Sequence, residues 1–179
     1  MSQTSEDVKE QTLMPDSEGQ EKTRLFAVAL FDVLGFENLV RSQGVLEIRR
    51  RYRTLIDQAV AVPDGRFLNL IDGAMVVGYM ENTHAYFSDT ILLWQPLDRL
   101  LAQPFVSRCA DMVAAALQME MPLRGAIALG PAELDKDANV YLGEPLIEAA
   151  RLESQQEWIG AAFGAFFNVA TLDGRDVYA

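Results

Sequence analysis

The sequence contains few of the residues that build covalent cross-links or soft-metal sites. Among its 179 residues there is one cysteine, Cys109, and one histidine, His84. A single cysteine excludes an internal disulfide and a cysteine cluster for zinc. A single histidine argues against a Ser-His-Asp triad and against a histidine-rich metal site. Because Cys109 lies in an apolar helical stretch, we expect its thiol to be buried and structural.

Basic charge and long apolar runs are scarce as well. The 26 acidic and 15 basic residues give a formal net charge of -11, which argues against a general nucleic-acid binder because such binding needs a basic surface. No apolar run reaches the length of a membrane span, and the polar beginning lacks a signal-peptide core. The motif G-x-x-x-x-G-K-[ST] is absent, which excludes a P-loop nucleotidase. We expect a cytoplasmic protein that binds neither membranes nor nucleic acids.

The residues that are present divide the chain into two parts. Residues 1–23 are polar and mostly acidic and cannot bury enough apolar surface to offset their ordering entropy, so we expect a disordered tail. Residues 24–179 should form one domain. The apolar patterns predict strands over 25–34, 67–71, 74–79, 86–94 and 123–129, helices over 37–60, 104–119 and from beyond Leu142 to about 154, and a strand-rich segment over 158–169. This order predicts an α+β fold with helices packed on one face of a sheet.

Turn residues and apolar spacing refine this outline. Gly44 is the point at which the helix over 37–60 can divide into two pieces. The apolar spacing places Leu46 and Leu117 on the inner faces of their helices. Residues 63–65 (Pro-Asp-Gly) should form a turn, and residues 72–73 (Asp-Gly) should close a hairpin between two short strands.

Two acidic residues stand in strongly apolar surroundings. Asp32 interrupts the run LFAVALFDVL near its end, and Asp89 lies within YFSDTILLW. An ionised carboxylate in a buried strand loses several kcal/mol of hydration unless a partner compensates it. A divalent cation shared by both acids, Mg²⁺ or Mn²⁺, would supply that compensation through hard oxygen ligands. A structural salt bridge is the alternative, and the pattern alone does not choose between them.

The turn after Asp32 is a candidate phosphate site. It leads directly into a helix, and the first N–H groups of a helix, together with its dipole, attract anions. We therefore expect Leu34, Gly35 and Phe36 to contact substrate phosphates, which usually complete the coordination of such a cation.

Four blocks, in this order, resemble the class III adenylyl and guanylyl cyclases. Residues 26–40 (FAVALFDVLGFENLV) resemble the opening strand and helix of that family, F-x-D-[IV]-x-G-F, and residues 87–93 (FSDTILL) resemble its hairpin strand with the second metal aspartate. Residues 123–130 (LRGAIALG) and 141–153 (YLGEPLIEAARLE) resemble its R-[VI]-G-I-x-x-G strand and W-G-[DE]-x-V-N-x-A-x-R helix. The resemblance implies a ferredoxin-like class III cyclase fold with a central, mainly antiparallel sheet.

The resemblance also implies roles for individual residues. Asp32 and Asp89, with the carbonyl of Val33, would bind two divalent cations, Mn²⁺ or Mg²⁺. Arg151 falls on the arginine that stabilises charge on the transferring phosphate; the alternative is a helix pair with Glu148 or Glu153. In this family the site lies between two subunits, which implies a homodimer in which Arg151 comes from the opposite chain. Arg124 either contacts phosphate or neutralises a buried acid.

Three positions depart from the purine cyclases. Ile147 replaces an asparagine that contacts the transition state. Ala85 stands where adenylyl cyclases carry a purine-reading lysine, and Val140 stands near its acidic partner. Neither replacement can make the hydrogen bonds that read a purine. The blocks FDVLGF, FSDT, LRGAIALG and GEPLIEAARLE look more like the bacterial pyrimidine cyclases of antiphage defence, the Pycsar systems, which implies conversion of UTP or CTP, with UTP favoured, to a cyclic monophosphate that activates a separate effector.

Two rival functions and one charged segment remain open at this point. The domain could be a catalytically silent relative that binds a nucleotide or a protein, which the loss of the asparagine at Ile147 favours. It could also be a purine cyclase that reads its base through other residues. The arginines between Arg49 and Arg53 are either a solvated helix face or a patch that attracts the triphosphate or aids dimerisation. Tyr52, within this run, either packs against the core or stacks on a base.

Overall fold

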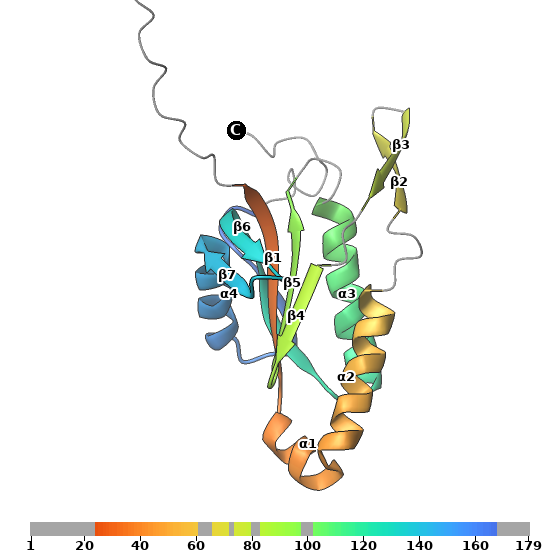
Figure 1. Ribbon diagram of the computed structural model, residues 1–179, viewed down its shortest axis with the longest axis vertical. Coiled ribbons are helices and arrows are strands. Elements are labelled where there is room, and N and C mark those ends of the chain that lie inside the picture. Colours follow the sequence, from red (N-terminus) through yellow and green to blue (C-terminus); the bar gives the residue numbers. More distant parts are fainter. Residues whose placement is uncertain (1–23, 61–65, 72–73, 80–82, 98–101, 168–179) are drawn as a thin grey trace, which may run out of the picture.

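The computed structural model describes residues 24–60, 66–71, 74–79, 83–97 and 102–167. The predicted acidic tail, the turn at 63–65, the hairpin residues 72–73 and the last residues of the predicted domain, 168–179, lie outside this range. Figure 1 shows the described elements as a central sheet with helices on both sides.

The main sheet has the strand order β4-β5-β1-β6-β7, and β8 pairs with β6. Its strands are β1 (Leu25–Val33), β4 (Thr83–Phe87), β5 (Thr90–Pro96), β6 (Leu123–Asp135), β7 (Val140–Gly143) and β8 (Gly160–Phe163). Every pairing is antiparallel except that of β8 with β6. Two further strands, β2 (Arg66–Ile71) and β3 (Ala74–Tyr79), pair with each other as a separate antiparallel hairpin. The predicted α+β fold with a central, mainly antiparallel sheet is confirmed.

Helices cover both faces of this sheet, so the prediction that they pack on one face was wrong. The side chains of β1 alternate between the two faces. Ala27, Ala29, Phe31 and Val33 pack toward α2 (Val45–Val60) and α3 (Ala102–Gln118). Phe26, Val28 and Leu30 pack on the opposite side, which α4 (Glu144–Ser154) covers. Figure 1 shows α4 on one side of the sheet and α2 with α3 on the other. The continuous apolar run of β1 is explained by this burial on both faces.

The predicted break at Gly44 is confirmed. Helix α1 (Phe36–Gln43) ends there, and α2 begins one residue later. Gly44 has a φ of 82°, a conformation that a residue with a side chain adopts only with strain. The break changes the direction of the second helix, and Leu46 is consequently 79% exposed rather than on its inner face. Leu117, near the end of α3, is also exposed.

One short strand was missed. Residues Val140–Gly143 form β7 and pair with the far end of β6 before α4 begins. Strand β6 is longer than the strand predicted over 123–129 and reaches Asp135, because its last residues pair with β7. In the segment predicted to be strand-rich, β8 occupies Gly160–Phe163.

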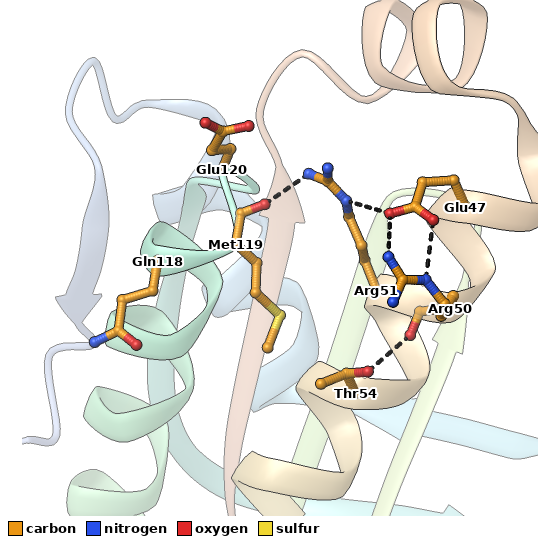
Figure 2. A pocket seen from close by; sticks show the side chains of 7 residues that line it. All are labelled: Glu47, Arg50, Arg51, Thr54, Gln118, Met119 and Glu120. Atoms are coloured by element: carbon orange, nitrogen blue, oxygen red, sulfur yellow. Dashed lines mark hydrogen bonds and ion pairs between the residues drawn. The ribbon is translucent and has the colours of Figure 1, made fainter.

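A side-chain contact ties α2 to α3, as Figure 2 shows. The Arg51 guanidinium donates to the Glu47 carboxylate at 3.1 Å and to the carbonyl oxygen of Met119, at the end of α3, at 2.8 Å. The last carbonyls of a helix lack partners within the helix, so Arg51 caps α3 from a neighbouring element. Arg50 binds the same Glu47 carboxylate.

Two expectations from composition can be compared with this structure. Cys109 is free and buried, and burial raises the pKa of its thiol to about 12, as expected of a structural cysteine. None of the described helices is both long enough and apolar enough to cross a membrane.

Candidate functional site

Asp32 is the next-to-last residue of β1, where the strand leaves the core. It pairs with Thr90 of β5 on one side and with Arg124 of β6 on the other. By the alternation of β1, its side chain lies on the face that α4 covers. The side chain is 26% exposed, so Asp32 is half-buried at the rim of the core and not enclosed in it.

Asp89 lies in a turn, so the prediction that it sits inside a strand was wrong. The expected strand over 86–94 is a hairpin: β4 ends at Phe87, and β5 begins at Thr90 directly opposite it. Ser88 between them has a φ of 55°, which ends the extended conformation and turns the chain back. The N–H of Val33 donates to the carbonyl oxygen of Asp89 at 3.0 Å, which fixes this turn beside the end of β1.

The two aspartates nevertheless come together. The pKa of Asp32 is raised above its ordinary value of 3.8, first by burial and then by the negative charge of Asp89; a side-chain hydrogen bond between the two carboxyl groups contributes in the same direction. A carboxyl group with a raised pKa beside a second carboxylate lacks sufficient positive charge around it. This is the electrostatic setting in which a cation would bind.

Arg124 supplies only part of the missing charge to Asp32: it lowers the Asp32 pKa, but less than burial and the charges of Asp89 and Glu153 raise it. Its guanidinium lies 3.9 Å from the Asp32 carboxylate but 2.6 Å from that of Glu153. It also donates to the backbone carbonyl oxygen of Gln156 at 3.1 Å. The Glu153 side chain is only 13% exposed. Of the two roles considered for Arg124, the structure favours neutralisation of a buried acid, and that acid is Glu153.

The chain after Asp32 forms the expected turn. Gly35 adopts a left-handed conformation, and no side chain caps the N-terminus of α1. The Leu34 N–H donates to the carbonyl oxygen of Pro122 at 2.9 Å, so it is not available to a phosphate. Phosphate contacts of Gly35 and Phe36 at this uncapped helix start stay predictions. The carbonyl of Val33 also stays a predicted ligand, on a residue that is almost wholly buried.

Arg151 is exposed on α4, and its guanidinium has no ion pair or hydrogen bond with the described part of the chain. The two acids considered as its helix partners are engaged elsewhere. Glu148 accepts a hydrogen bond from the N–H of Ala165 at 2.8 Å, and Glu153 binds Arg124. Ile147, one turn before Arg151, is 71% exposed. The outer face of α4 thus carries a free cation beside an exposed apolar side chain.

Of the two predicted base-pocket residues, the structure places Ala85 on the α4 side of the sheet. Ala85 pairs with Leu92 and packs against the cluster that contains Trp94. Val140 is half-buried at the beginning of β7, and its neighbour Tyr141 contacts the Trp94 ring. Neither Ala85 nor Val140 carries a hydrogen-bonding side chain.

The donor set can be compared with the needs of a divalent cation. No group of three or more His, Cys, Asp or Glu side chains arranged to hold a metal occurs among the described residues. Asp32 and Asp89 are hard oxygen donors of the kind that Mg²⁺ and Mn²⁺ prefer, and the raised pKa of Asp32 is the effect that a cation would reverse. The pair fits a site completed by substrate phosphates and water. It does not fit a metal site built by the protein alone.

The arginine run divides into two sets. Arg50 and Arg51 bind Glu47, as described above. Arg49 and Arg53, one turn apart on α2, face a cavity of about 480 Å³ instead. Phe36, a predicted phosphate contact, and Tyr52, considered for stacking on a base, also line it, whereas the sequence reasoning missed Tyr86 and Phe87. The spacing Val45, Arg49, Tyr52 and Arg53, which puts all four on one helix face, is the signal that could have indicated it.

Comparisons with known proteins give a limited result. No protein-family model and no curated protein matches the chain. Among solved structures, the chain is similar to the crystal structure of an adenylate/guanylate cyclase/hydrolase from Silicibacter pomeroyi, with a TM-score of 0.48 and 23% sequence identity over 78% of this chain and 75% of that chain.

Proposed function

We propose that this protein is a nucleotidyl cyclase that converts a pyrimidine nucleoside triphosphate, UTP or CTP, to its 3′,5′-cyclic monophosphate. The observation that carries the proposal is the approach of Asp32 and Asp89 at one end of the sheet, where burial and the charge of Asp89 raise the pKa of Asp32 and the nearest guanidinium, that of Arg124, is held by Glu153. The four ordered sequence blocks around these residues resemble the class III cyclases and support the same reaction.

The reaction joins the ribose 3′-oxygen to the α-phosphorus. The bond between the α-phosphorus and the oxygen that bridges to the β-phosphate breaks, pyrophosphate leaves, and the 3′-hydroxyl proton passes to solvent. Divalent cations held by the two aspartates would supply neutralisation of the triphosphate and acidification of the 3′-hydroxyl. Asp32, fixed on β1, and Asp89, fixed by the Val33 hydrogen bond, orient the bound substrate.

Arg151 would stabilise the charge that develops on the α-phosphate, because a guanidinium stays ionised and offers several donors to phosphate oxygens. Its exposure and its lack of a partner in the described chain leave it available for this role. We propose that it acts in the site of a second copy. The exposed Ile147 beside it supports burial of this face of α4 in a homodimer.

The pyrimidine preference rests on Ala85 and Val140. A site that reads a purine by hydrogen bonds needs polar groups, and neither side chain has one. By the same resemblance to the antiphage pyrimidine cyclases, the cyclic product would activate a separate effector. A catalytically silent domain is the competing proposal, and Ile147 in place of the family's asparagine is the residue that favours it.

Product identification tests this proposal. The purified protein is incubated with ATP, GTP, CTP and UTP together with Mn²⁺, and the products are identified by mass spectrometry. The proposal predicts cyclic UMP or cyclic CMP as the main product and its loss in Asp89→Ala, with the fold retained by circular dichroism. Cyclic AMP or cyclic GMP as the main product would overturn the pyrimidine assignment, and full activity of Asp89→Ala would overturn the metal assignment.

A further inference from the structure

A second concave site lies beside the Asp32–Asp89 pair, on the side of the sheet that α2 covers. It is the cavity of about 480 Å³ between α2, the beginning of α1 and the end of the β4–β5 hairpin. Tyr86 pairs with Ile91, whose side chain belongs to the core beneath α2 and α3. Asp32 lies on the α4 face, as does Ala85. Tyr86 in the cavity wall and Ala85 of the predicted base pocket therefore lie on different faces of the sheet.

Two arginines give the cavity its charge. Arg49 and Arg53 are both exposed, and neither has an ion pair or hydrogen bond with any described residue. The neighbouring Arg50 and Arg51, in contrast, are bound to Glu47. In a protein with a net charge of -11, two unpaired guanidinium groups one helical turn apart are a local concentration of positive charge, and such groups can bind phosphate oxygens through several donors.

Aromatic rings form much of the remaining wall. Phe36 and Tyr52 meet edge to face, with ring centroids 6.0 Å apart, and Tyr52 and Tyr86 lie at the same separation. Tyr86 and Phe87 are each more than half exposed. Exposed rings around a hollow offer faces on which a planar group can stack.

One polar atom in the wall of the cavity lacks a hydrogen-bond partner among the described residues. Tyr52 is 5% exposed, yet its hydroxyl has no hydrogen-bond partner in the described structure. A buried hydroxyl without a partner loses the free energy of its hydrogen bonds with water. The hydroxyl is enclosed beneath the cavity wall; burial raises its pKa, and the negative charges of Asp89 and Asp32 raise it further.

We propose that this cavity is a second nucleotide site, which binds a nucleoside phosphate with its base against the aromatic rings and its phosphates on Arg49 and Arg53. The site adjoins the Asp32–Asp89 pair, since Ser88, which precedes Asp89, and Phe36, a predicted phosphate contact of the first site, both line the cavity. Binding here does not depend on the proposed cyclase activity. It requires no divalent cation, because the arginines bind the phosphate oxygens directly and offset part of their charge.

Calorimetric titration with UTP and with ATP in EDTA tests the proposal. Without a divalent cation, the wild-type protein is expected to bind at least one of the two. The double variant Arg49→Ala/Arg53→Ala should bind it at least roughly tenfold more weakly. Arg50→Ala removes the same kind of charge from the same helix, outside this cavity, and should bind like the wild type. Asp89→Asn should also retain binding.

Three results would overturn the proposal. The first is that neither nucleotide binds in EDTA. The second is equal weakening in Arg50→Ala and in the double variant, which would indicate attraction by overall charge. The third is loss of binding in Asp89→Asn, which would make the cavity part of the metal site. If no cyclic product forms with any nucleotide, the proposed cyclase function is wrong. Binding in EDTA that is weakened only in the double variant would still support the second nucleotide site.

Discussion

The backbone N–H of Val33 donates a 3.0 Å hydrogen bond to the carbonyl oxygen of Asp89. This bond joins the end of β1 to the turn between β4 and β5, and it brings the carboxyl groups of Asp32 and Asp89 together although 56 residues separate them in the sequence. The proximity costs stability in the absence of a cation, since the charge of Asp89, after burial, opposes the ionisation of Asp32.

Asp32 gives the first prediction, a pH dependence with a definite sign. Because its pKa in the folded protein is raised above 3.8, the folded state binds the proton more tightly than the unfolded state. The free energy of unfolding should therefore fall as the pH rises from about 4 through the raised pKa. In EDTA, Asp32→Asn should be more stable than the wild type at pH 7, and the difference should shrink toward pH 4. Urea unfolding of both proteins across this pH range measures the difference in their free energies of unfolding. A difference that grows as the pH falls would contradict the prediction.

The Arg124–Glu153 pair gives a prediction about stability. Arg124→Gln leaves a carboxylate that is 13% exposed without its counter-charge and should lower the free energy of unfolding by about 2 kcal/mol. Replacing both residues, as Arg124→Gln with Glu153→Met, should recover most of the loss, because no unpaired charge remains. Arg41→Gln, which breaks an exposed pair with Glu37, is the matched control and should change stability by less than about 0.5 kcal/mol. If Arg124→Gln and Arg41→Gln lower the free energy of unfolding equally, burial of the Arg124–Glu153 pair does not increase its contribution to stability.

Subunit complementation tests the role of Arg151. If Asp89 of one copy works with Arg151 of the other, Asp89→Asn and Arg151→Ala should each be inactive alone. Dimers re-formed from an equal mixture should recover about a quarter of wild-type activity, since half the dimers are mixed and each mixed dimer has one intact site. Product formation from UTP is the measurement. No recovery from variants that both dimerise would place Arg151 outside the shared site.

Gly125 is predicted to resist substitution. A Cβ at this position would lie 2.3 Å from the carbonyl oxygen of Leu30 and 2.9 Å from the Cα of Phe31. Because backbone atoms of the neighbouring strand cannot move away, Gly125→Ala should cost about 3 kcal/mol or more. Gly44→Ala is a useful comparison: its Cβ would meet nothing within 4 Å, but its φ is 82°, so the cost should be about 1–2 kcal/mol. Thermal unfolding of the two variants should rank them in this order.

The sequence predicted what depends on local pattern. The strand from Leu25, the break at Gly44 and the helix that contains Cys109 follow from apolar spacing and glycine, and the structure agrees with all three. The position of Asp89 could not be predicted in the same way. The run YFSDTILLW is as apolar as a continuous strand, and a serine gives little indication that residue 88 will adopt a positive φ.

Contacts between segments far apart in the chain could not be predicted from the sequence either. Arg124 and Glu153 are 29 residues apart, and their pairing depends on α4 returning across β6. For the same reason Glu153 was considered as a partner of Arg151, its neighbour on the helix. The cavity beside Arg49 was not predicted because it needs β4 to bring Tyr86 against α2, which only the folded sheet does.

The most direct measurement is titration of Mn²⁺ in the presence of the non-cyclisable analogue uridine α,β-methylene triphosphate, followed by electron paramagnetic resonance. The account predicts that the wild-type protein binds Mn²⁺ and that Asp32→Asn and Asp89→Asn each weaken binding by roughly tenfold or more. Asp57→Asn, which removes an exposed acid on α2, should bind like the wild type. If either Asp32→Asn or Asp89→Asn binds Mn²⁺ as tightly as the wild type, the two aspartates do not share a cation site.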